Sequence, residues 1–222
     1  MSNEPDVIDR VRAEKLTYLS PTCLRDLFNG VEEIERAGRS GVIIETGAAL
    51  GGSAIVMASA KSKSRRMKIY DAFGMIPAPS EKDGEDVHRR FTTIATGKSK
   101  GIGGDLYYGY RKDLLRDVTQ AYARFGLPIE SSNIELIKGL FADTLHVDEP
   151  IALAHLDGDW YESTKICLER IAPFLVPGGR LIIDDYFKWS GCRKAVDEYF
   201  HGREGYRREK HGRLHIVREG TT

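Results

Sequence analysis

Cysteine is scarce in this sequence, and its scarcity excludes two kinds of small, cross-linked domain. The 222 residues include only three cysteines: Cys23, Cys167 and Cys192. They are odd in number, widely spaced and set in helix-like segments, which suits neither a disulfide framework nor a structural zinc site. We therefore expect free thiols and a reducing cytoplasm as the location of the protein.

Long apolar runs and an excess of one charge are also missing. Uninterrupted apolar stretches cover a few residues, as in Ile151–Ala154, and the N-terminal stretch is charged throughout, which predicts neither a signal peptide nor a membrane-spanning helix. Lys plus Arg and Asp plus Glu number 33 each, so no net field attracts the chain to nucleic acid or to an anionic membrane. The expected partner is a small molecule.

The apolar residues that are present suit one α/β domain over residues 1–222, with a helical N-terminal segment at 1–40. Continuous apolar runs predict buried parallel strands at Val42–Glu45, Lys68–Tyr70, Ile134–Ile137, Ile151–Leu156 and Leu181–Ile183. Helical spacing predicts a first helix that begins at Ser20 and Pro21 and stops at Gly38. It predicts further helices at Ser53–Ala60, Leu114–Phe125, Ser163–Leu175 and Cys192–Phe200. The alternation predicts a doubly wound, mostly parallel sheet, and the tail predicts a final antiparallel hairpin, Tyr206–Glu209 with Arg213–Val217.

The segment 74–111 interrupts this alternation with many glycines, two prolines and many charges. An insertion of this length in an α/β domain is either a functional lid or a surface loop, and we expect a lid. Its tyrosines Tyr107, Tyr108 and Tyr110 could stack on a sugar ring or pack the insertion onto the domain.

A glycine-rich turn follows the first expected strand and precedes a helix. In doubly wound folds such a turn lets the chain pass close to a ligand, which also meets the free N–H groups of the helix. The alternative is that the glycines serve tight packing alone. We predict that this turn binds a cofactor, through Glu45, Thr46, Gly47, Gly51 and Ser53.

Asp71 at the end of the second strand can accept hydrogen bonds from the two hydroxyls of a ribose, which both NAD and S-adenosylmethionine carry. The residues of the turn discriminate between these two possible cofactors. Ala49 replaces the second glycine of the pyrophosphate-binding pattern, and Glu45 beside the turn would repel phosphate but attract an amino group. The sequence therefore favours S-adenosylmethionine. Phe141 and Asp143 follow the third strand, and the family resemblance described below implies that they meet the adenine, although Asp143 could equally cap a short helix.

Carboxylates follow the fourth and fifth strands, at Asp157, Asp159, Asp184 and Asp185. Neighbouring parallel strands bring their carboxyl ends together, and clustered carboxylates either take up protons or bind a hard cation such as Mg²⁺. We predict Asp157, Asp184 and Asp185 as metal ligands, with Asp157 also beside the cofactor. Asp159 is predicted as the base that takes the proton of an acceptor hydroxyl, or otherwise as a fourth ligand. Helix capping by Asp159 or Asp185 is the simpler alternative.

Several motifs in this order resemble the macrocin O-methyltransferase family (TylF/MycF-type): VIIETGAALGGSA, YDAF, FADTL, LDGDWYEST and IIDDY, together covering Ile43–Tyr186. The resemblance implies a class I, Rossmann-like methyltransferase fold that uses S-adenosylmethionine and Mg²⁺ held by Asp157, Asp184 and Asp185. It also implies a general base at Asp159, a sugar or glycosylated metabolite as the hydroxyl acceptor, and an oligomer. The insertion carries its own sequence, so the acceptor itself is not identified.

Three other functions are compatible with the sequence. A metal-dependent catechol or phenol O-methyltransferase would use the same carboxylates, and a nicotinamide-dependent oxidoreductase would use the same fold. The third is a cofactor-binding scaffold without catalysis. His155, inside the fourth strand, is expected to be structural, and Lys188 and Trp189 could border the acceptor.

Overall fold

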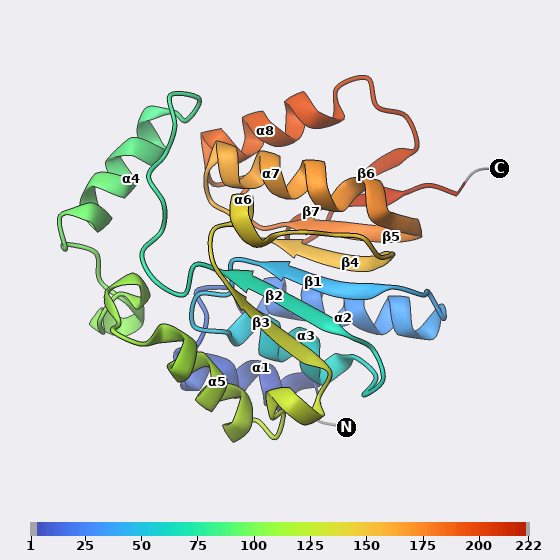
Figure 1. Cartoon of the computed structure of the whole chain (residues 1–222), viewed down its shortest axis with the longest axis horizontal. Coiled ribbons are helices and arrows are strands. Elements are labelled where there is room, and N and C mark those ends of the chain that lie inside the picture. Colours follow the sequence, from blue (N-terminus) through green and yellow to red (C-terminus); the bar gives the residue numbers. More distant parts are fainter. Residues whose placement is uncertain (1–3, 221–222) are drawn as a thin grey trace.

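The computed structural model describes residues 4–220 of the chain. Figure 1 shows a central sheet with helices on both faces. The strands are β1 (Val42–Thr46), β2 (Met67–Asp71), β3 (Ile134–Lys138), β4 (Ile151–Leu156), β5 (Leu175–Ile183), β6 (Tyr206–Lys210) and β7 (Leu214–Arg218). The helices are α1 (Glu4–Ala13), α2 (Pro21–Arg36), α3 (Gly52–Ala60), α4 (Glu85–Ala95), α5 (Leu114–Arg124), α6 (Phe141–Thr144), α7 (Tyr161–Ile171) and α8 (Ser190–Phe200).

The strand order is β3-β2-β1-β4-β5-β7-β6. The first five strands in sequence pair in parallel, and β7 joins β5 and β6 in antiparallel fashion. This is the predicted doubly wound sheet with a C-terminal hairpin. In Figure 1 the arrowheads of β1, β2 and β4 point toward the side on which α4 lies, so the insertion stands at the carboxyl edge of the sheet.

Two apolar cores lie on the two faces of the sheet, because successive strand residues point to opposite sides. Ile43 and Leu153 belong to the core with α1, α2, α3 and α5, whereas Ile44 and Ala154 belong to the core with α7 and α8. Helix α2 begins as predicted, since the Ser20 hydroxyl accepts a hydrogen bond from the N–H of Cys23. The three cysteines are free and buried.

Strand β5 differs from the prediction. It begins at Leu175 rather than Leu181, and α7 ends at Ile171 rather than reaching Leu175. A bulge explains the difference: Ile151 of β4 pairs with Leu175, and Leu153 pairs with Arg180, so the residues between Leu175 and Arg180 are looped out. The glycines in this stretch resemble a helix stop in the sequence, but they lie within a strand.

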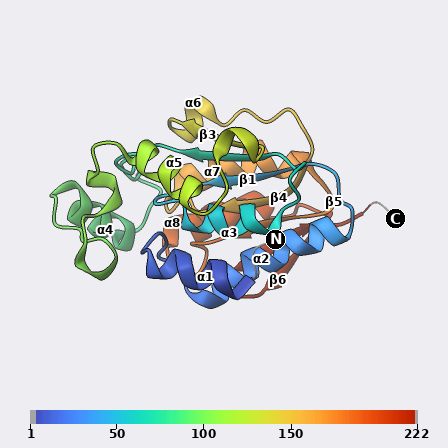
Figure 2. The same cartoon turned by 90° about the horizontal axis from the view of Figure 1, so that it is seen from below.

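The insertion is an ordered part of the fold. It contains α4 and two short 3-10 helices, Ile102–Gly104 and Tyr108–Tyr110. Figure 2 shows α4 projecting beyond one end of the sheet. Asp83 attaches the insertion to the domain, because its buried carboxylate accepts the N–H of Tyr161 at 2.8 Å, at the start of α7. Whether the insertion opens and closes as a lid stays a prediction.

None of the helices within residues 4–220 has both the length and the apolar character to cross a bilayer.

Candidate active site

The turn between β1 and α3 passes directly under the end of β4. Gly47 has φ +89°, and a Cβ added there would lie 1.8 Å from the carbonyl oxygen of Asp157. Only glycine fits such an approach. Gly51, with φ +88°, then forms the N-cap of α3. The two glycines therefore let the chain turn sharply at the carboxyl edge of the sheet.

Asp71 fixes the shape of this turn. Its Oδ2 accepts the N–H groups of Ala48 and Ala49 at 2.7 and 2.9 Å, and its Oδ1 accepts the N–H of Phe73 at 2.5 Å. Burial raises the pKa of Asp71, although these three donors act in the opposite direction. The carboxylate thus has a structural role at the position where sequence analysis predicts a ribose contact.

A hollow beside the turn, which we call the first hollow, lies between β1, β2, β4 and the insertion. Four of the predicted cofactor residues line it: Gly47, Asp71, Phe141 and Asp157. Trp160 and the segment 76–78 line another part of the wall. The Trp160 indole N–H donates to the carbonyl of Pro77 at 2.9 Å, which attaches the insertion to this wall.

The remaining predicted cofactor residues lie elsewhere. Glu45 is fully buried and contacts the Nδ1 atom of His155 at 2.9 Å. Thr46 is fully buried, and its hydroxyl accepts from the Cys167 thiol at 3.4 Å. Asp143 is exposed and Ser53 borders a neighbouring hollow. Gly51 acts through the turn, so direct contacts of these residues with a cofactor stay predictions.

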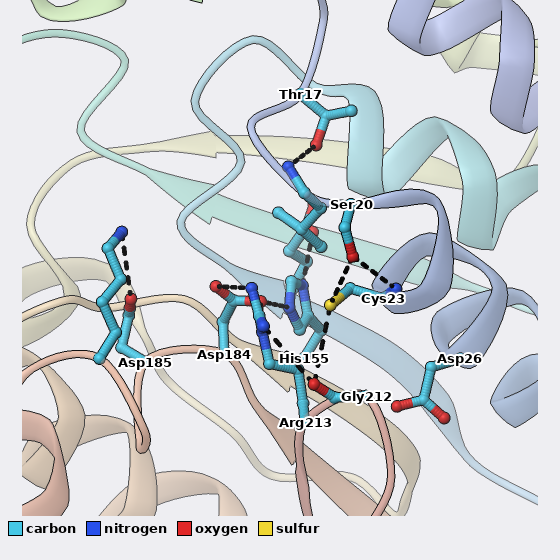
Figure 3. Close-up of polar contacts among 12 residues, drawn as sticks. Thr17, Ser20, Cys23, Asp26, His155, Asp184, Asp185, Gly212 and Arg213 are labelled. Atoms are coloured by element: carbon cyan, nitrogen blue, oxygen red, sulfur yellow. Dashed lines mark hydrogen bonds and ion pairs between the residues drawn. The ribbon is translucent and has the colours of Figure 1, made fainter.

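The structure brings Asp157, Asp184 and Asp185 together, with one oxygen of each within 4.8 Å of the others. Asp184 is held by Arg213, whose Nε and Nη2 atoms lie 2.6 and 3.2 Å from its two oxygens. The Nε2 atom of His155 lies 3.7 Å from the same carboxylate. Figure 3 shows these two side chains converging on Asp184, Arg213 from the β6–β7 hairpin and His155 from β4.

These surroundings shift the three carboxyl groups in different directions. For Asp184, burial raises the pKa, but the nearby imidazole of His155 and the hydrogen bonds from Arg213 outweigh burial and lower it to about 2. For Asp157, burial and the charge of Asp185 raise the pKa well above its usual value. Burial and the charge of Asp184 likewise raise the pKa of Asp185. Ionisation of Asp157 and Asp185 is thus disfavoured by burial and by the neighbouring negative charges.

A divalent cation fits this donor set. Three carboxylates converge here against the Arg213 guanidinium on Asp184 and the Lys188 ammonium 3.9 Å from Asp185 Oδ1, and a divalent cation would relieve their mutual repulsion. The buried Oδ1 atom of Asp185 has no hydrogen-bond partner within residues 4–220. Hard oxygen ligands suit Mg²⁺, and a buried oxygen without a partner is where a cation would bind.

Behind this cluster, the positive charge of protonated His155 offsets the negative charge of Glu45. Burial lowers the pKa of His155, but the nearby carboxylate of Asp184 and the hydrogen-bonded carboxylate of Glu45 outweigh burial and raise it to about 9. His155 is therefore structural, in agreement with the sequence-based expectation.

Asp159 lies at the edge of the cluster in an unusual backbone conformation, with φ +54°. Its N–H donates to Asp185 Oδ2 at 3.0 Å, and its Oδ1 accepts the indole N–H of Trp189 at 2.9 Å. Burial and the charge of Asp185 raise the pKa of Asp159 to about 8. A carboxyl group with that pKa is suited to accept a proton near neutral pH.

A second hollow opens on the other side of the same aspartates. It shares Asp157, Asp159 and Trp160 with the first hollow. Its outer wall is formed by Tyr18, Arg90, Tyr107, Tyr108, Lys188 and Trp189. The two hollows therefore meet at the carboxylates, which is the arrangement needed for transfer of a group from one bound molecule to another.

Sequence analysis missed Arg213 and Arg90. Arg213 follows β6 and reaches Asp184 only because β7 pairs with β5, and Arg90 lies in the insertion without any motif. No local pattern marks either residue.

The chain resembles known proteins over most of its length. The sequence model of the macrocin O-methyltransferase (TylF) family matches residues 13–206. A protein of Streptomyces olivaceus, 8-demethyl-8-(2,3-dimethoxy-alpha-L-rhamnosyl)-tetracenomycin-C 4'-O-methyltransferase, is 33% identical over 213 residues, covering 91% of this chain and 76% of that protein.

Solved structures share the fold. The O-methyltransferase NovP superposes with a TM-score of 0.75 at 24% identity, covering 93% of this chain and 83% of NovP. An O-methyltransferase from Bacillus cereus, solved in complex with SAH, has a TM-score of 0.57 at 16% identity and covers 98% of this chain and 90% of its own.

Proposed function

Because this chain belongs to the macrocin O-methyltransferase family, we propose that it transfers a methyl group from S-adenosylmethionine to a hydroxyl group of a sugar or sugar-bearing small molecule. The chain is an O-methyltransferase by its family. The observation that carries the proposal is that two hollows meet at Asp157 and Asp159. One hollow would receive the methyl donor and the other the acceptor.

The first hollow suits the donor. It lies beside the glycine turn at the carboxyl ends of β1 and β2, where doubly wound folds bind nucleosides. Phe141 borders it and offers an apolar surface for a base. We propose that Gly47, Asp71, Phe141 and Asp157 contact S-adenosylmethionine, and that Gly51 shapes the turn. The predicted contacts of Glu45, Thr46, Ser53 and Asp143 would require side-chain or loop adjustment on binding.

Asp157, Asp184 and Asp185 would hold Mg²⁺. When bound, a divalent cation polarises an acceptor hydroxyl and lowers its pKa. Arg213 keeps Asp184 ionised and oriented, with two contacts at 2.6 and 3.2 Å. The protein contribution is therefore a fixed set of oxygen ligands whose excess negative charge is partly offset by one guanidinium.

Asp159 is proposed as the base. The acceptor oxygen forms a bond to the methyl carbon as the carbon–sulfur bond breaks, the sulfur keeps the bonding pair, and the hydroxyl proton passes to Asp159. Trp189 holds one oxygen of Asp159 at 2.9 Å, which leaves the other available to the substrate. Asp159 and Trp160 line both hollows, so the proton acceptor lies where the two substrates would meet.

Membership in this family does not support the nicotinamide-dependent oxidoreductase or the non-catalytic scaffold. The functional test decides whether the acceptor is a catechol instead of a sugar. A cytoplasmic location and an oligomeric state stay predictions.

The test is a screen with S-adenosylmethionine that carries a deuterated methyl group, read by mass spectrometry of the acceptors. The panel contains free sugars, sugar phosphates, nucleotide-linked sugars, glycosylated natural products and catechols, each with Mg²⁺ and with EDTA. We expect label on a sugar hydroxyl in Mg²⁺ alone. Asp159→Asn should lower the rate at least about a hundredfold, as expected for loss of a general base.

The control is Asp197→Asn, which removes an exposed carboxylate that pairs with Arg208 away from both hollows. This variant should keep wild-type turnover. Label on catechols and on no sugar would contradict the proposed acceptor class.

A further inference from the structure

The outer wall of the second hollow carries positive charge that the proposed chemistry does not use. Arg90 of α4 and Lys188, which follows β5, both line this hollow, opposite in charge to the aspartates that also border it. Lys188 is 59% exposed, lies 3.9 Å from Asp185 Oδ1 and stacks on the Trp189 ring. Methyl transfer to a neutral sugar requires neither cation.

Arg90 has no counter-ion among residues 4–220. It is partly buried and forms no ion pair or hydrogen bond with any residue in the described part of the chain. Its guanidinium carbon lies 5.6 Å from the centre of the Tyr107 ring. A cation–π contact at that distance is weak, since such contacts contribute about 0.5–1 kcal/mol at exposed sites. The donors of the guanidinium are therefore largely unused in the structure.

The acidic residues of α4 are engaged elsewhere. Glu85 pairs with Arg89 at 3.1 Å on the exposed side of the helix. Asp86 accepts the N–H and the hydroxyl of Ser190 at 3.0 and 2.5 Å, which joins α4 to α8. Arg90 is consequently left facing the hollow without a carboxylate from its own helix.

A second arginine adds positive charge on this side of the domain. Burial raises the pKa of Tyr18, whereas the positive charges of Arg90 and Arg111 act to lower it. Arg111 pairs with Asp117 at 2.8 Å, but its buried Nε has no hydrogen-bond partner within residues 4–220. The wall formed by Tyr18, Tyr107 and Tyr108 thus combines ring faces with positive charge.

We infer that the acceptor carries a phosphate group, as a sugar phosphate or a nucleoside-diphosphate sugar, and that Arg90 binds this phosphate. The planar guanidinium donates two parallel hydrogen bonds to such an anion. Lys188 adds a second cation at the same wall, which favours a phosphate over a group with one negative charge. The tyrosines provide the ring faces on which a base or a sugar can stack. This inference rests on the proposed function, because it specifies the acceptor of the same site.

The test is a calorimetric titration of the protein, saturated with S-adenosylhomocysteine in Mg²⁺, with four probes. UDP and glucose 1-phosphate carry phosphate, glucuronate carries a carboxylate, and methyl glucoside is neutral. We expect the two phosphate probes to bind more tightly than the others. Arg90→Gln should weaken their binding at least about tenfold, because hydrogen bonds to charged groups are the stronger class.

Arg89→Gln is the matched control, since it removes the same charge from the neighbouring, exposed position of α4. It should leave phosphate binding unchanged, and Arg90→Lys should restore part of the affinity lost in Arg90→Gln. Bound S-adenosylhomocysteine in Arg90→Gln shows that the variant is folded. Comparison of UDP with glucose 1-phosphate distinguishes a nucleotide-linked sugar from a simple sugar phosphate.

Equal phosphate affinity in Arg90→Gln and wild type would overturn the inference, as would tighter binding of glucuronate or methyl glucoside than of both phosphate probes. In each case S-adenosylhomocysteine would still bind and the proposed methyl transfer would stand. Failure of wild-type protein to bind S-adenosylhomocysteine would instead overturn the proposed function.

Discussion

The carboxylate of Asp159 depends on one neighbouring side chain for its orientation. Trp189 donates its indole N–H to Oδ1 at 2.9 Å, and Trp160 packs edge-on against Trp189 with ring centres 5.7 Å apart. A left-handed backbone conformation at Asp159 is rare for a residue with a side chain and costs energy. The surrounding contacts, including the one with Trp189, therefore hold this partly buried carboxyl group against the other aspartates.

Trp189→Phe should therefore lower kcat while retaining the aromatic packing. The phenyl ring cannot donate to Asp159, and loss of a hydrogen bond to a charged group corresponds to about a tenfold change or more. Affinity for S-adenosylhomocysteine should not change, because Trp189 does not line the first hollow. Steady-state kinetics and calorimetry measure the two quantities.

Phe187→Leu is the control for loss of a nearby aromatic ring. Phe187 is 46% exposed and lines neither hollow, so this variant should retain kcat. An unchanged kcat in Trp189→Phe would show that Asp159 is positioned without the tryptophan.

The aspartates of the site could be predicted because each follows a strand directly in the sequence. Strand ends meet at one edge, so Asp157, Asp184 and Asp185 are brought together by topology alone. Arg213 and Arg90 could not be predicted, because their places depend on the hairpin and on the path of the insertion. Glu45 shows the opposite problem: its position beside the turn suggested a ligand contact, but its side chain contacts His155.

At the scale of elements, a buried histidine joins α2 to the C-terminal hairpin. His215 of β7 accepts a hydrogen bond from Arg180 at Nδ1, because a guanidinium can only donate. Its Nε2 therefore carries the hydrogen that is donated to Asp26 of α2 at 2.9 Å. Burial raises the pKa of Asp26, but the hydrogen bond from His215 outweighs burial and lowers it.

Asp26→Asn should reduce the free energy of unfolding at neutral pH by about 1–3 kcal/mol, the usual cost of losing a partner of a buried group. Since the folded pKa of Asp26 lies below the unfolded value near 3.8, the contribution of its charge is present above that pH and is lost as the pH falls through the folded pKa. The difference between variant and wild type should therefore shrink in acid. Urea unfolding over a pH series measures it.

Glu32→Gln is the matched control on α2, because Glu32 is 47% exposed and pairs with Arg36 one turn away. It should change stability by less than about 1 kcal/mol. A difference for Asp26→Asn that stays constant through acid pH would contradict an ionic contribution.

Most elements could be predicted from the periodicity of apolar residues, and the doubly wound, mostly parallel sheet followed from the alternation of strands and helices. Strand β5 could not, because its bulge places glycines and a proline inside a strand, where local sequence favours a turn. The helix α4 was not predicted, since its apolar face is provided by few residues, with Val87 and Ile94 buried.

At the scale of the whole molecule, the fold forms two separate hollows, one for each proposed substrate, and the two hollows meet at the clustered carboxylates. The glycine turn and β2 shape the first hollow, while the insertion, the N-terminal segment and the residues after β5 shape the second. Such a division lets the acceptor wall vary while the transfer chemistry is retained.

The most direct test of the proposed site is a calorimetric titration of S-adenosylhomocysteine into two proteins, the wild type and the paired variant Asp184→Asn with Asp185→Asn. Each protein is also titrated with Mn²⁺ as a substitute for Mg²⁺. We expect both proteins to bind S-adenosylhomocysteine, because neither aspartate lines the first hollow, and only wild type to bind Mn²⁺. Absence of S-adenosylhomocysteine binding to wild type, or undiminished Mn²⁺ binding in the paired variant, would contradict the account.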